Sequence, residues 1–377
     1  MKILVTGGAG FIGTHLTRHL LALGHQIVVL DNFLPQVHGG NRALAADVAP
    51  NVQLLTGDVA DPAIFGSALV GADCVVHLAA ETGTGQSMYE VARYERTNLA
   101  GTALLYDVLT KSPGHQVHRV VVASSRSIYG EGAYRCPQDG IIYPSSRSSA
   151  DKAAGLFDPL CPLCGGGCET IPTPESAPFQ PSSFYGLTKQ VQEQTVLMFG
   201  QVLGIPSFAM RYQNVYGPGQ SLQNPYTGIL AIFSNLARTG RPINIFEDGL
   251  ESRDFVFVDD VVRATAACVV KDVDTCHAVN VGSCERTTVF EVAQVVNAFY
   301  GGFSRVETTG AFREGDIRHG LADLTRARAL LGYEPQWKFR DGLKCFLEWA
   351  NESDPSLTGY EESLAEMRRQ GLLRVSG

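Results

Sequence analysis

The stretch "TGGAGFIGTHL", Thr6 to Leu16, follows the apolar run Ile3–Val5 near the start of the chain and decides the fold. Because glycine has no Cβ, a glycine-rich turn lets a ligand approach the main chain closely. The helix that follows such a turn offers free N–H groups to an anion. The stretch therefore predicts a strand–turn–helix unit that binds the pyrophosphate of a dinucleotide.

The next predicted strand, "QIVVLD" over Gln26–Asp31, ends in a carboxylate. This residue, Asp31, lies about 20 residues beyond the glycines. A carboxylate at that place accepts hydrogen bonds from the ribose hydroxyls of a dinucleotide and repels a 2′-phosphate. An ordinary tight turn explains the glycines alone, but not their combination with Asp31. The combination therefore predicts NAD, and not NADP, as the cofactor.

Short β-rich runs alternate with helical stretches through the first half of the chain, for example "QIVVLD", the helix expected over 99–110, and "RVVVASS". Such alternation predicts an α/β fold, with a doubly wound parallel Rossmann sheet and a smaller C-terminal substrate-binding lobe. We expect the NAD-binding domain to cover residues 1–214 with a return strand at about 277–282. The lobe is expected to come mostly from residues 215–377.

Composition restricts the possible partners. The chain has 377 residues, 45% hydrophobic content and a net charge of −8. No block of Lys and Arg interrupts the mixed charge pattern, so we expect no nucleic-acid partner. No apolar run reaches the roughly 18 residues of a membrane helix, and no signal-peptide pattern opens the sequence. We therefore expect a cytoplasmic protein without a membrane partner.

The stretch "SSFYGLTK" carries the predicted chemistry. Tyr185 and Lys189 lie four residues apart and so share one face of a helix. A lysine ammonium near a phenol favours the phenolate, which makes Tyr185 a usable general base. Ser125 ends the predicted strand "RVVVASS" and can hydrogen-bond the same substrate oxygen. A surface Tyr–Lys pair is the alternative, but the dinucleotide-binding unit and the Ser-rich strand end favour catalysis.

The motifs "TGGAGFIG", "SSRSIYG", "YGLTK", "RYQNVYGPGQ" and "GDIRHGLADLTRARALLGYEP" extend over nearly the whole chain. In these motifs the sequence resembles the extended short-chain dehydrogenase/reductase family, in its nucleotide-sugar epimerase and dehydratase branch. The resemblance implies that Ser125, Tyr185 and Lys189 are catalytic and that the substrate is a nucleotide sugar. It also implies a homodimer that pairs through helices near Leu99 and Tyr185.

The same resemblance assigns further residues to the two ligands. The residues implied to bind NAD are Gly7, Gly10, Phe11, Ile12, Gly13, Asp31, Asn32, Asp58, Val59, Leu78, Ala79, Ala80, Thr82, Asn98, Tyr185 and Lys189. Those implied to bind the sugar nucleotide are Ser125, Ser127, Asn214, Phe246, Arg253 and Arg318. The two arginines would hold the diphosphate with their guanidinium forks, and surface salt bridges are the alternative. A helix N-cap is the alternative for Asp58.

The residues after Ser125 narrow the reaction. The 4,6-dehydratases of the branch carry an Asp-Glu pair there, because removing water across C5 and C6 needs its own acid and base. This chain has Arg126 and Ser127 instead. The remaining reaction is oxidation at C4, rotation of the keto sugar and return of the hydride to its other face, which is a 4-epimerisation. A nucleotide-sugar reductase and a non-catalytic NAD-binding sensor are the alternatives from other classes.

Three stretches bear on the substrate. "NFLPQVHGG", "QSLQNPYTGILAIF" and a cysteine-bearing insertion resemble the dTDP-L-rhamnose 4-epimerases, which interconvert dTDP-L-rhamnose and dTDP-6-deoxy-L-talose. The apolar stretch Pro225–Phe233 is expected to line the base and the sugar, with a plain core helix as the alternative. UDP-hexose and UDP-hexuronate 4-epimerases are the other assignments. Gln213 departs from the branch, which usually has an aromatic residue at this position.

The insertion, about 133–174, is rich in Gly, Pro and Ser and contains four cysteines, Cys136, Cys161, Cys164 and Cys168. Clustered cysteines in a cytosolic protein favour a metal over disulfides. The spacing of Cys161 and Cys164 is that of a zinc knuckle, and Cys136 with Cys168 would complete four thiolate ligands. Asp139 could replace one of them. We expect a structural zinc ion, and four free thiols in a loop are the alternative.

Overall fold

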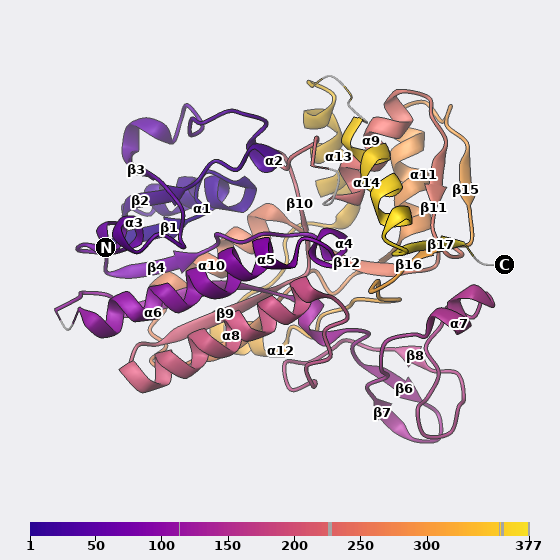
Figure 1. Cartoon of the computed structure of the whole chain (residues 1–377), viewed down its shortest axis with the longest axis horizontal. Helices are drawn as coiled ribbons and strands as arrows, with labels where there is room; N and C mark the ends of the chain where they lie inside the picture. The colour runs from indigo at the N-terminus through magenta and orange to yellow at the C-terminus, as the bar shows by residue number, and fades with distance from the viewer. Residues whose placement is uncertain (113, 225–227, 354, 356–357, 376–377) are drawn as a thin grey trace.

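A seven-stranded parallel sheet lies at the centre of the computed structural model (Figure 1). The structure describes all residues except 113, 225–227, 354, 356–357 and 376–377. The strand order is β13-β9-β5-β4-β1-β2-β3. These strands are β1 (Lys2–Thr6), β2 (Gln26–Asp31), β3 (Val52–Thr56), β4 (Cys74–His77), β5 (Arg119–Ser125), β9 (Ser207–Tyr212) and β13 (His277–Val281).

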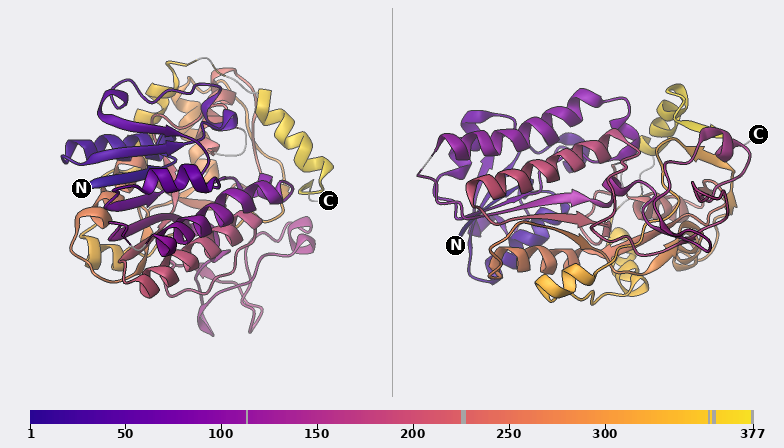
Figure 2. Two further views of the ribbon diagram at one scale, coloured as in Figure 1. Left: turned by 60° about the vertical axis from the view of Figure 1, so that its left-hand side comes forward. Right: turned by 90° about the horizontal axis from the view of Figure 1, so that it is seen from below.

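Helices cover both faces of this sheet, so its inner strands are apolar runs without alternation. Strand β5, for example, is buried along its whole length. One face is covered by α1 (Phe11–Ala22), α10 (Val258–Val270) and α12 (Thr325–Leu331), and the other by α3 (Pro62–Leu69), α6 (Gly101–Lys111) and α8 (Phe184–Leu203) (Figure 2). This arrangement confirms the doubly wound sheet that the sequence predicted.

The connections reverse direction at β1. This strand pairs in parallel with β2 on one side and with β4 on the other. Where the crossovers leave in opposite directions, a crevice opens at the carboxyl ends of the strands, and ligands of such folds bind there. The glycine-rich turn, Asp31 and Ser125 all stand at this edge of the sheet.

A smaller lobe lies beyond the carboxyl ends of the strands (Figure 1). It contains β10 (Asn214–Tyr216), β11 (Ile243–Ile245), β12 (Ser252–Phe257), β14 (Arg286–Thr288), β15 (Val306–Thr308), β16 (Ala311–Arg313), β17 (Leu373–Val375), α9 (Ile229–Arg238), α11 (Val289–Phe299), α13 (Phe339–Ala350) and α14 (Thr358–Arg369). The C-terminal half also returns α10, β13 and α12 to the sheet layers. Of the predicted apolar stretch Pro225–Phe233, residues 225–227 lie outside the described residues, and α9 begins at Ile229.

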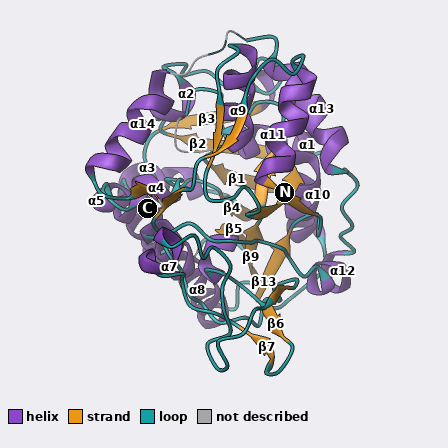
Figure 3. Cartoon of the chain, turned by 90° about the vertical axis from the view of Figure 1, so that its right-hand side faces the viewer, coloured by secondary structure: helices purple, strands orange, loops and turns teal. Residues whose placement is uncertain are grey.

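The cysteine-bearing insertion projects from the lower side of the molecule in Figure 1 and again in Figure 3. It forms its own small antiparallel sheet in the order β7-β6-β8. Its elements are β6 (Tyr134–Cys136), β7 (Gly140–Ile142), α7 (Ser149–Ala153) and β8 (Glu169–Thr170). The insertion is therefore a separate structural unit between β5 and α8.

Short elements complete the chain and shape the edge of the crevice. They are α2 (Pro35–His38), η1 (Ala49–Asn51), α4 (Thr84–Ser87), α5 (Val91–Tyr94), the π-helical turn η2 (Glu95–Ala100) and η3 (Arg126–Tyr129). Among the helices of the described residues, none combines the length and the apolar character needed to cross a bilayer.

Candidate active site

The glycine-rich turn connects β1 to α1 and packs against neighbouring strand ends. Gly7 has a φ of +68°, and its N–H donates to the carbonyl oxygen of Leu30 (2.8 Å). A Cβ at Gly13 would overlap the carbonyl oxygen of Gly7, so this position requires glycine. Helix α1 starts after Gly10 without a side-chain cap. The first N–H groups of the helix are therefore available to a phosphate.

Asp31 ends β2 beside this turn and lines the same cavity. Its carboxylate oxygens accept hydrogen bonds from the main-chain N–H groups of Ala9 (3.0 Å) and Phe33 (2.9 Å). His38 Nε2 lies 3.5 Å from Asp31 Oδ1, and the sequence analysis did not identify this neighbour. The main chain therefore fixes the carboxylate at the edge of the cavity, in the position predicted for ribose binding.

A cavity of about 330 Å³ follows the carboxyl edge of the sheet. The predicted NAD-binding residues in its lining are Gly7, Gly10, Phe11, Ile12, Gly13, Asp31, Asn32, Val59, Leu78, Ala79, Ala80, Thr82, Tyr185 and Lys189. The lining also includes Glu81 and Thr97, which were not predicted to bind a ligand, and Gln213 and Gln220 of the motif "RYQNVYGPGQ". Tertiary packing brings these separate segments to one cavity.

Two of the predicted NAD-binding residues do not line this cavity. Asp58 Oδ1 accepts a hydrogen bond from the Ala60 N–H (2.8 Å), and the N-cap of α3 is Asp61, so Asp58 does not take the alternative role either. Asn98 is fully buried, and its Oδ1 accepts from the Glu81 N–H (2.8 Å). Asn98 therefore positions the loop that lines the cavity, while a contact between Asp58 and the cofactor stays a prediction.

The three predicted catalytic residues come together in the cavity lining. Ser125 ends β5, while Tyr185 and Lys189 lie one turn apart on α8. The Ser125 Oγ accepts hydrogen bonds from the N–H (3.2 Å) and the hydroxyl (2.9 Å) of Ser127. Lys189 Nζ donates to the carbonyl oxygen of Ala123 (2.8 Å), which holds the lysine against β5. The triad thus spans the boundary between the sheet and α8.

Burial and nearby groups set the proton affinities of these side chains. Burial raises the pKa of Tyr185, whereas a hydrogen bond with Ser125 and the positive charge of Arg126 lower it. Burial lowers the pKa of Lys189 to about 7. Arg126 therefore brings a positive charge to the phenol, a role that the sequence analysis did not give it.

A second cavity of about 370 Å³ adjoins the first and lies against the smaller lobe. Ser125, Tyr185 and Gln213 line both cavities. The two ligand spaces consequently meet at the catalytic side chains. Gln213 departs from the pattern of the branch at this junction, and its buried Oε1 has no hydrogen-bond partner among the described residues. A ligand that donates a hydrogen bond to this oxygen would satisfy it.

Most of the predicted substrate-binding residues line the second cavity, namely Ser125, Ser127, Asn214, Phe246 and Arg253. Arg253 Nη1 donates to two carbonyl oxygens, those of Ser252 (2.9 Å) and Arg318 (3.1 Å). Arg126 Nε donates to the Asn214 Oδ1 (2.9 Å) and lines the same cavity. Two guanidinium groups thus border the second cavity, and no carboxylate of the described residues is hydrogen-bonded to them, which suits a diphosphate.

Arg318, predicted to hold the diphosphate, is not among the residues that line either cavity. Its side chain is 1% exposed, and its guanidinium is paired with Asp158 (2.7 Å), Asp248 (2.7 Å) and Glu247 (3.1 Å). These carboxylates saturate the guanidinium and hold it away from the cavity lining. The insertion supplies one of them, Asp158, so the sequence around Arg318 gave no sign of this pairing.

Arg313 lines the second cavity, whereas Arg318 does not. The guanidinium carbon of Arg313 lies 4.7 Å from the centre of the Phe246 ring. Arg313 Nε is 3.2 Å from the carboxylate of Asp316, which lines the cavity as well. The alternation of β16 could have identified Arg313, because the buried Phe312 points to the opposite face of that strand.

Four side chains of the insertion gather at one point, those of Cys136, Asp139, Cys161 and Cys164. Their ligand atoms all lie within 4.8 Å of one another. Cys168, which was predicted as the fourth ligand, is not one of this group. None of these side chains lines either of the two cavities. Any metal bound here is therefore separate from the catalytic residues.

Comparison with known proteins identifies the family of this architecture. The model of the NAD dependent epimerase/dehydratase family matches residues 3–155 and 163–282. A dTDP-L-rhamnose 4-epimerase of Burkholderia thailandensis is 38% identical over 357 residues, which cover 94% of this chain and 96% of the relative. A putative UDP-glucose 4-epimerase of Methanocaldococcus jannaschii is 26% identical, with 93% of this chain and 99% of that relative covered.

Solved structures agree with the sequence comparison. The UDP-glucose 4-epimerase of Thermotoga maritima, solved with UDP-glucose, is similar with a TM-score of 0.75 and 28% identity, covering 93% of this chain and 99% of that one. The UDP-glucose 4-epimerase of Thermus thermophilus, solved with NAD, gives a TM-score of 0.72 and 26% identity, covering 94% and 100%. The similarity thus includes both the sheet and the smaller lobe.

Proposed function

Because this chain belongs to the NAD dependent epimerase/dehydratase family, we propose that it is a nucleotide-sugar 4-epimerase that interconverts dTDP-L-rhamnose and dTDP-6-deoxy-L-talose. The observation that carries this proposal is the meeting of the two cavities at Ser125 and Tyr185. Cofactor and sugar would face each other across these side chains. NAD, when bound, accepts a hydride from C4 of the sugar and returns it.

The side chains of this chain handle the proton. Tyr185, as the phenolate, takes the proton of the C4 hydroxyl while the hydride leaves C4, and the sugar becomes a 4-keto sugar. Ser125 hydrogen-bonds the same oxygen and keeps it near the phenol. The positive charge of Arg126 favours the phenolate, and Lys189 adds to this effect when it is protonated. After the keto sugar has rotated, Tyr185 returns the proton as the hydride arrives at the other face.

Rotation of the keto sugar requires that the nucleotide stays fixed while the hexose is held loosely. Arg253 and Arg313 are placed to hold the diphosphate, and Phe246 offers an aromatic face to the base. Asn214 and Arg126, which are hydrogen-bonded to each other, line the same cavity. Affinity would then reside in the nucleotide and not in the sugar ring.

The wall of the second cavity favours a 6-deoxy sugar. Apolar side chains of α9 and α14 line it, namely Ile229, Leu230, Ile232, Phe233, Leu364 and Met367. The methyl group of a 6-deoxy sugar needs no polar partner. A buried hydroxyl or carboxylate without a hydrogen-bond partner would instead weaken the binding free energy by about 1–3 kcal/mol. The identity to the Burkholderia thailandensis enzyme supports the same choice. UDP-hexose and UDP-hexuronate are the alternative substrates.

A side-by-side measurement of kcat/KM tests the substrate. The purified protein is incubated with dTDP-L-rhamnose, UDP-galactose and UDP-glucuronate, and the 4-epimers are separated by chromatography. We expect the highest kcat/KM for dTDP-L-rhamnose. A tenfold preference for either UDP-sugar would overturn the substrate while leaving the 4-epimerase activity intact.

A second measurement separates the epimerase from the other classes. We expect the purified protein to release about one NAD per chain on denaturation, because an epimerase regenerates NAD in every cycle. Net conversion of added NAD to NADH, with a keto sugar as the product, would instead indicate a reductase running in its oxidative direction. Retained NAD without conversion of any of the three sugars would indicate a sensor.

We also propose that the insertion binds a structural zinc ion, in addition to the NAD that takes part in the reaction. The gathered thiols support a metal, because thiolates are preferred ligands of zinc. None of the four side chains lines either cavity, which supports a structural role. Elemental analysis of protein purified without a chelator tests this proposal, and a protein free of zinc would refute it.

A cytoplasmic homodimer that pairs through α8 completes the proposal. Helix α8 carries a series of exposed apolar side chains, Leu187, Val191, Met198 and Val202. A second copy of the same helix would cover them through a two-fold axis. Light scattering coupled to size exclusion tests this dimer, and a monomer at micromolar concentration would rule it out.

A further inference from the structure

Two loops of the insertion share one sequence pattern and one shape. They are Cys136-Pro-Gln-Asp139-Gly140 and Cys161-Pro-Leu-Cys164-Gly165. Both glycines have a left-handed backbone, with φ values of +77° and +72°. Each loop also closes a hairpin, because Cys136 pairs with Gly140 across β6 and β7, and the Cys161 N–H donates to the carbonyl oxygen of Gly166 (2.8 Å). The aspartate of the first loop corresponds to the second cysteine of the other loop.

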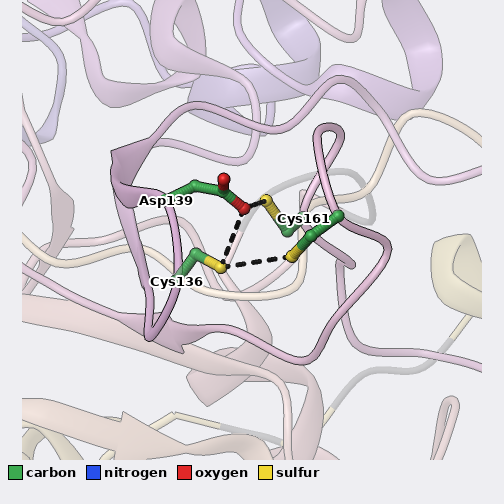
Figure 4. Close-up of side chains that lie close together, drawn as sticks. Cys136, Asp139 and Cys161 are labelled. Atoms are coloured by element: carbon green, nitrogen blue, oxygen red, sulfur yellow. Dashed lines mark hydrogen bonds between the residues drawn. The ribbon is translucent and has the colours of Figure 1, made fainter.

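The two loops face each other and bring their side chains together (Figure 4). Asp139 Oδ2 lies 3.3 Å from the sulfur of Cys136 and 3.1 Å from the sulfur of Cys161. The sulfurs of Cys136 and Cys164 are 3.5 Å apart. Sulfur ligands of a tetrahedral zinc ion, each about 2.3 Å from the metal, lie about 3.8 Å from one another. The four groups thus have nearly the spacing of a tetrahedral site.

Cys168 takes a different position. Its thiol donates to the carbonyl oxygen of Gly166 (3.5 Å), and it packs against the small apolar cluster of the insertion. It has no counterpart in the paired-loop pattern, although its thiol also interacts with those of Cys136 and Cys161. The mutual spacing of Cys136, Asp139, Cys161 and Cys164 supports a ligand set of three thiolates and one carboxylate.

The chain between the two loops, residues 140–160, reaches the smaller lobe through Arg147. The Arg147 side chain is 3% exposed and pairs with Glu131 (2.9 Å) and Glu247 (2.8 Å). Its Nη2 also donates to the carbonyl oxygen of Asp316 (3.1 Å). Phe246 and Asp316 line the second cavity. Arg147 therefore contacts Glu247, the residue after Phe246, and the main chain of Asp316.

Two further side chains of the same segment contact the lobe. The Lys152 side chain is 2% exposed, and its Nζ lies 2.7 Å from the carboxylate of Glu314, the residue after Arg313. Asp158 pairs with Arg318 (2.7 Å). The segment between the loops therefore packs behind Phe246, Arg313 and Asp316, the part of the second cavity assigned to the nucleotide.

We infer that a metal ion held by Cys136, Asp139, Cys161 and Cys164 fastens both ends of segment 140–160 and thereby fixes the nucleotide part of the second cavity. The inference rests on the proposed zinc site. One pair of ligands lies at the beginning of the segment and the other at its end. A metal that joins them closes the segment into a loop. The closure reduces the conformational freedom of the segment, so less entropy is lost when the segment packs against the lobe. Without this closure, the buried contacts of Arg147 and Lys152 would hold the segment alone.

Four single variants test the ligand set and the coupling. Cys164 and Asp139 are exposed, so Cys164→Ser and Asp139→Ala remove ligands without removing core packing. Cys168→Ser and Cys284→Ser are matched thiol controls, the second at an exposed cysteine outside the insertion. Zinc content is measured for all of them. We expect one zinc per chain in the wild type and in both controls, and at least a fivefold loss in the two ligand variants.

The coupling is measured by calorimetric titration with dTDP and with UDP, and the tighter nucleotide is used throughout. We expect Cys164→Ser to weaken nucleotide binding at least tenfold while the NAD released on denaturation stays the same. Lys152→Met, which removes one contact of the segment and no metal ligand, should weaken nucleotide binding with its zinc retained.

Each failure has a separate signature. A wild type without zinc would refute the metal itself, whatever the nucleotide affinities are. Loss of zinc in Cys168→Ser with retention in Asp139→Ala would overturn the ligand set. Loss of zinc in Cys164→Ser without any change in nucleotide affinity would overturn the coupling, even though the zinc site stands.

Discussion

Arg126 Nε donates a hydrogen bond to the Asn214 Oδ1 (2.9 Å), and this bond connects the end of β5 to the first strand of the smaller lobe. Burial and the neighbouring charge of Arg253 lower the pKa of Arg126 to about 10, so the guanidinium still carries its charge at neutral pH. The charge lies in the second cavity, beside both the phenol of Tyr185 and the proposed diphosphate position.

Replacing Arg126 tests this charge through a pH profile. The cation lowers the pKa of Tyr185, and the phenolate is the active form, so Arg126→Met should move the ascending limb of kcat/KM to higher pH. The KM for the nucleotide sugar should rise as well. Arg126→Lys keeps a positive charge and should restore part of the shift. An ascending limb at the wild-type pH in Arg126→Met would contradict the role.

Replacing Tyr185 tests the general base. Tyr185→Phe keeps the aromatic ring, which stands edge-on to Tyr94, and removes only the hydroxyl. We expect kcat to fall by about 10²-fold or more, with retained NAD and dTDP affinity unchanged. Turnover is measured with the preferred nucleotide sugar, and near-normal activity would remove Tyr185 from the mechanism.

Replacing Asp31 tests the choice of cofactor. Asp31→Ala removes the carboxylate at the cavity edge, so the protein should retain less NAD and discriminate less against NADP. The nucleotides released on denaturation are identified by chromatography after growth and after reconstitution with either cofactor. Asp47→Ala, which removes an exposed carboxylate paired with Arg18, is the control and should retain NAD normally. A wild type that already prefers NADP would contradict the assignment.

Replacing Arg313 is predicted to affect substrate binding, whereas replacing Arg318 is predicted to affect stability. Arg313→Met removes a guanidinium from the cavity and should raise the KM for the nucleotide sugar at least tenfold, with little change in stability. Arg318→Met leaves three carboxylates around an empty position and should lower the free energy of unfolding by about 3–5 kcal/mol. Urea unfolding and KM are measured for both variants. The opposite pattern would restore Arg318 as the residue that holds the diphosphate.

The sequence by itself determined the features that depend on neighbours along the chain. The glycine spacing and the carboxylate of Asp31 predicted the dinucleotide-binding unit, and the helix expected over 99–110 is present as α6, Gly101–Lys111. Tyr185 and Lys189 share a helix face because four residues make about one turn. Helix period, strand alternation and turn chemistry act over a few residues, so a single sequence contains this information in full.

Only the tertiary structure decided which polar side chains reach the ligands. Arg313 and Arg318 lie five residues apart in one motif, and the carboxylates that bury Arg318 come from residues far along the chain. Asn98, predicted at the cofactor, holds a loop of the cavity lining, and Asp139, the alternative ligand, joins Cys136, Cys161 and Cys164 in the cluster. The role of a buried charge or a metal ligand depends on partners that are distant in sequence. The spatial distances to these partners are set only when the layers of the fold pack.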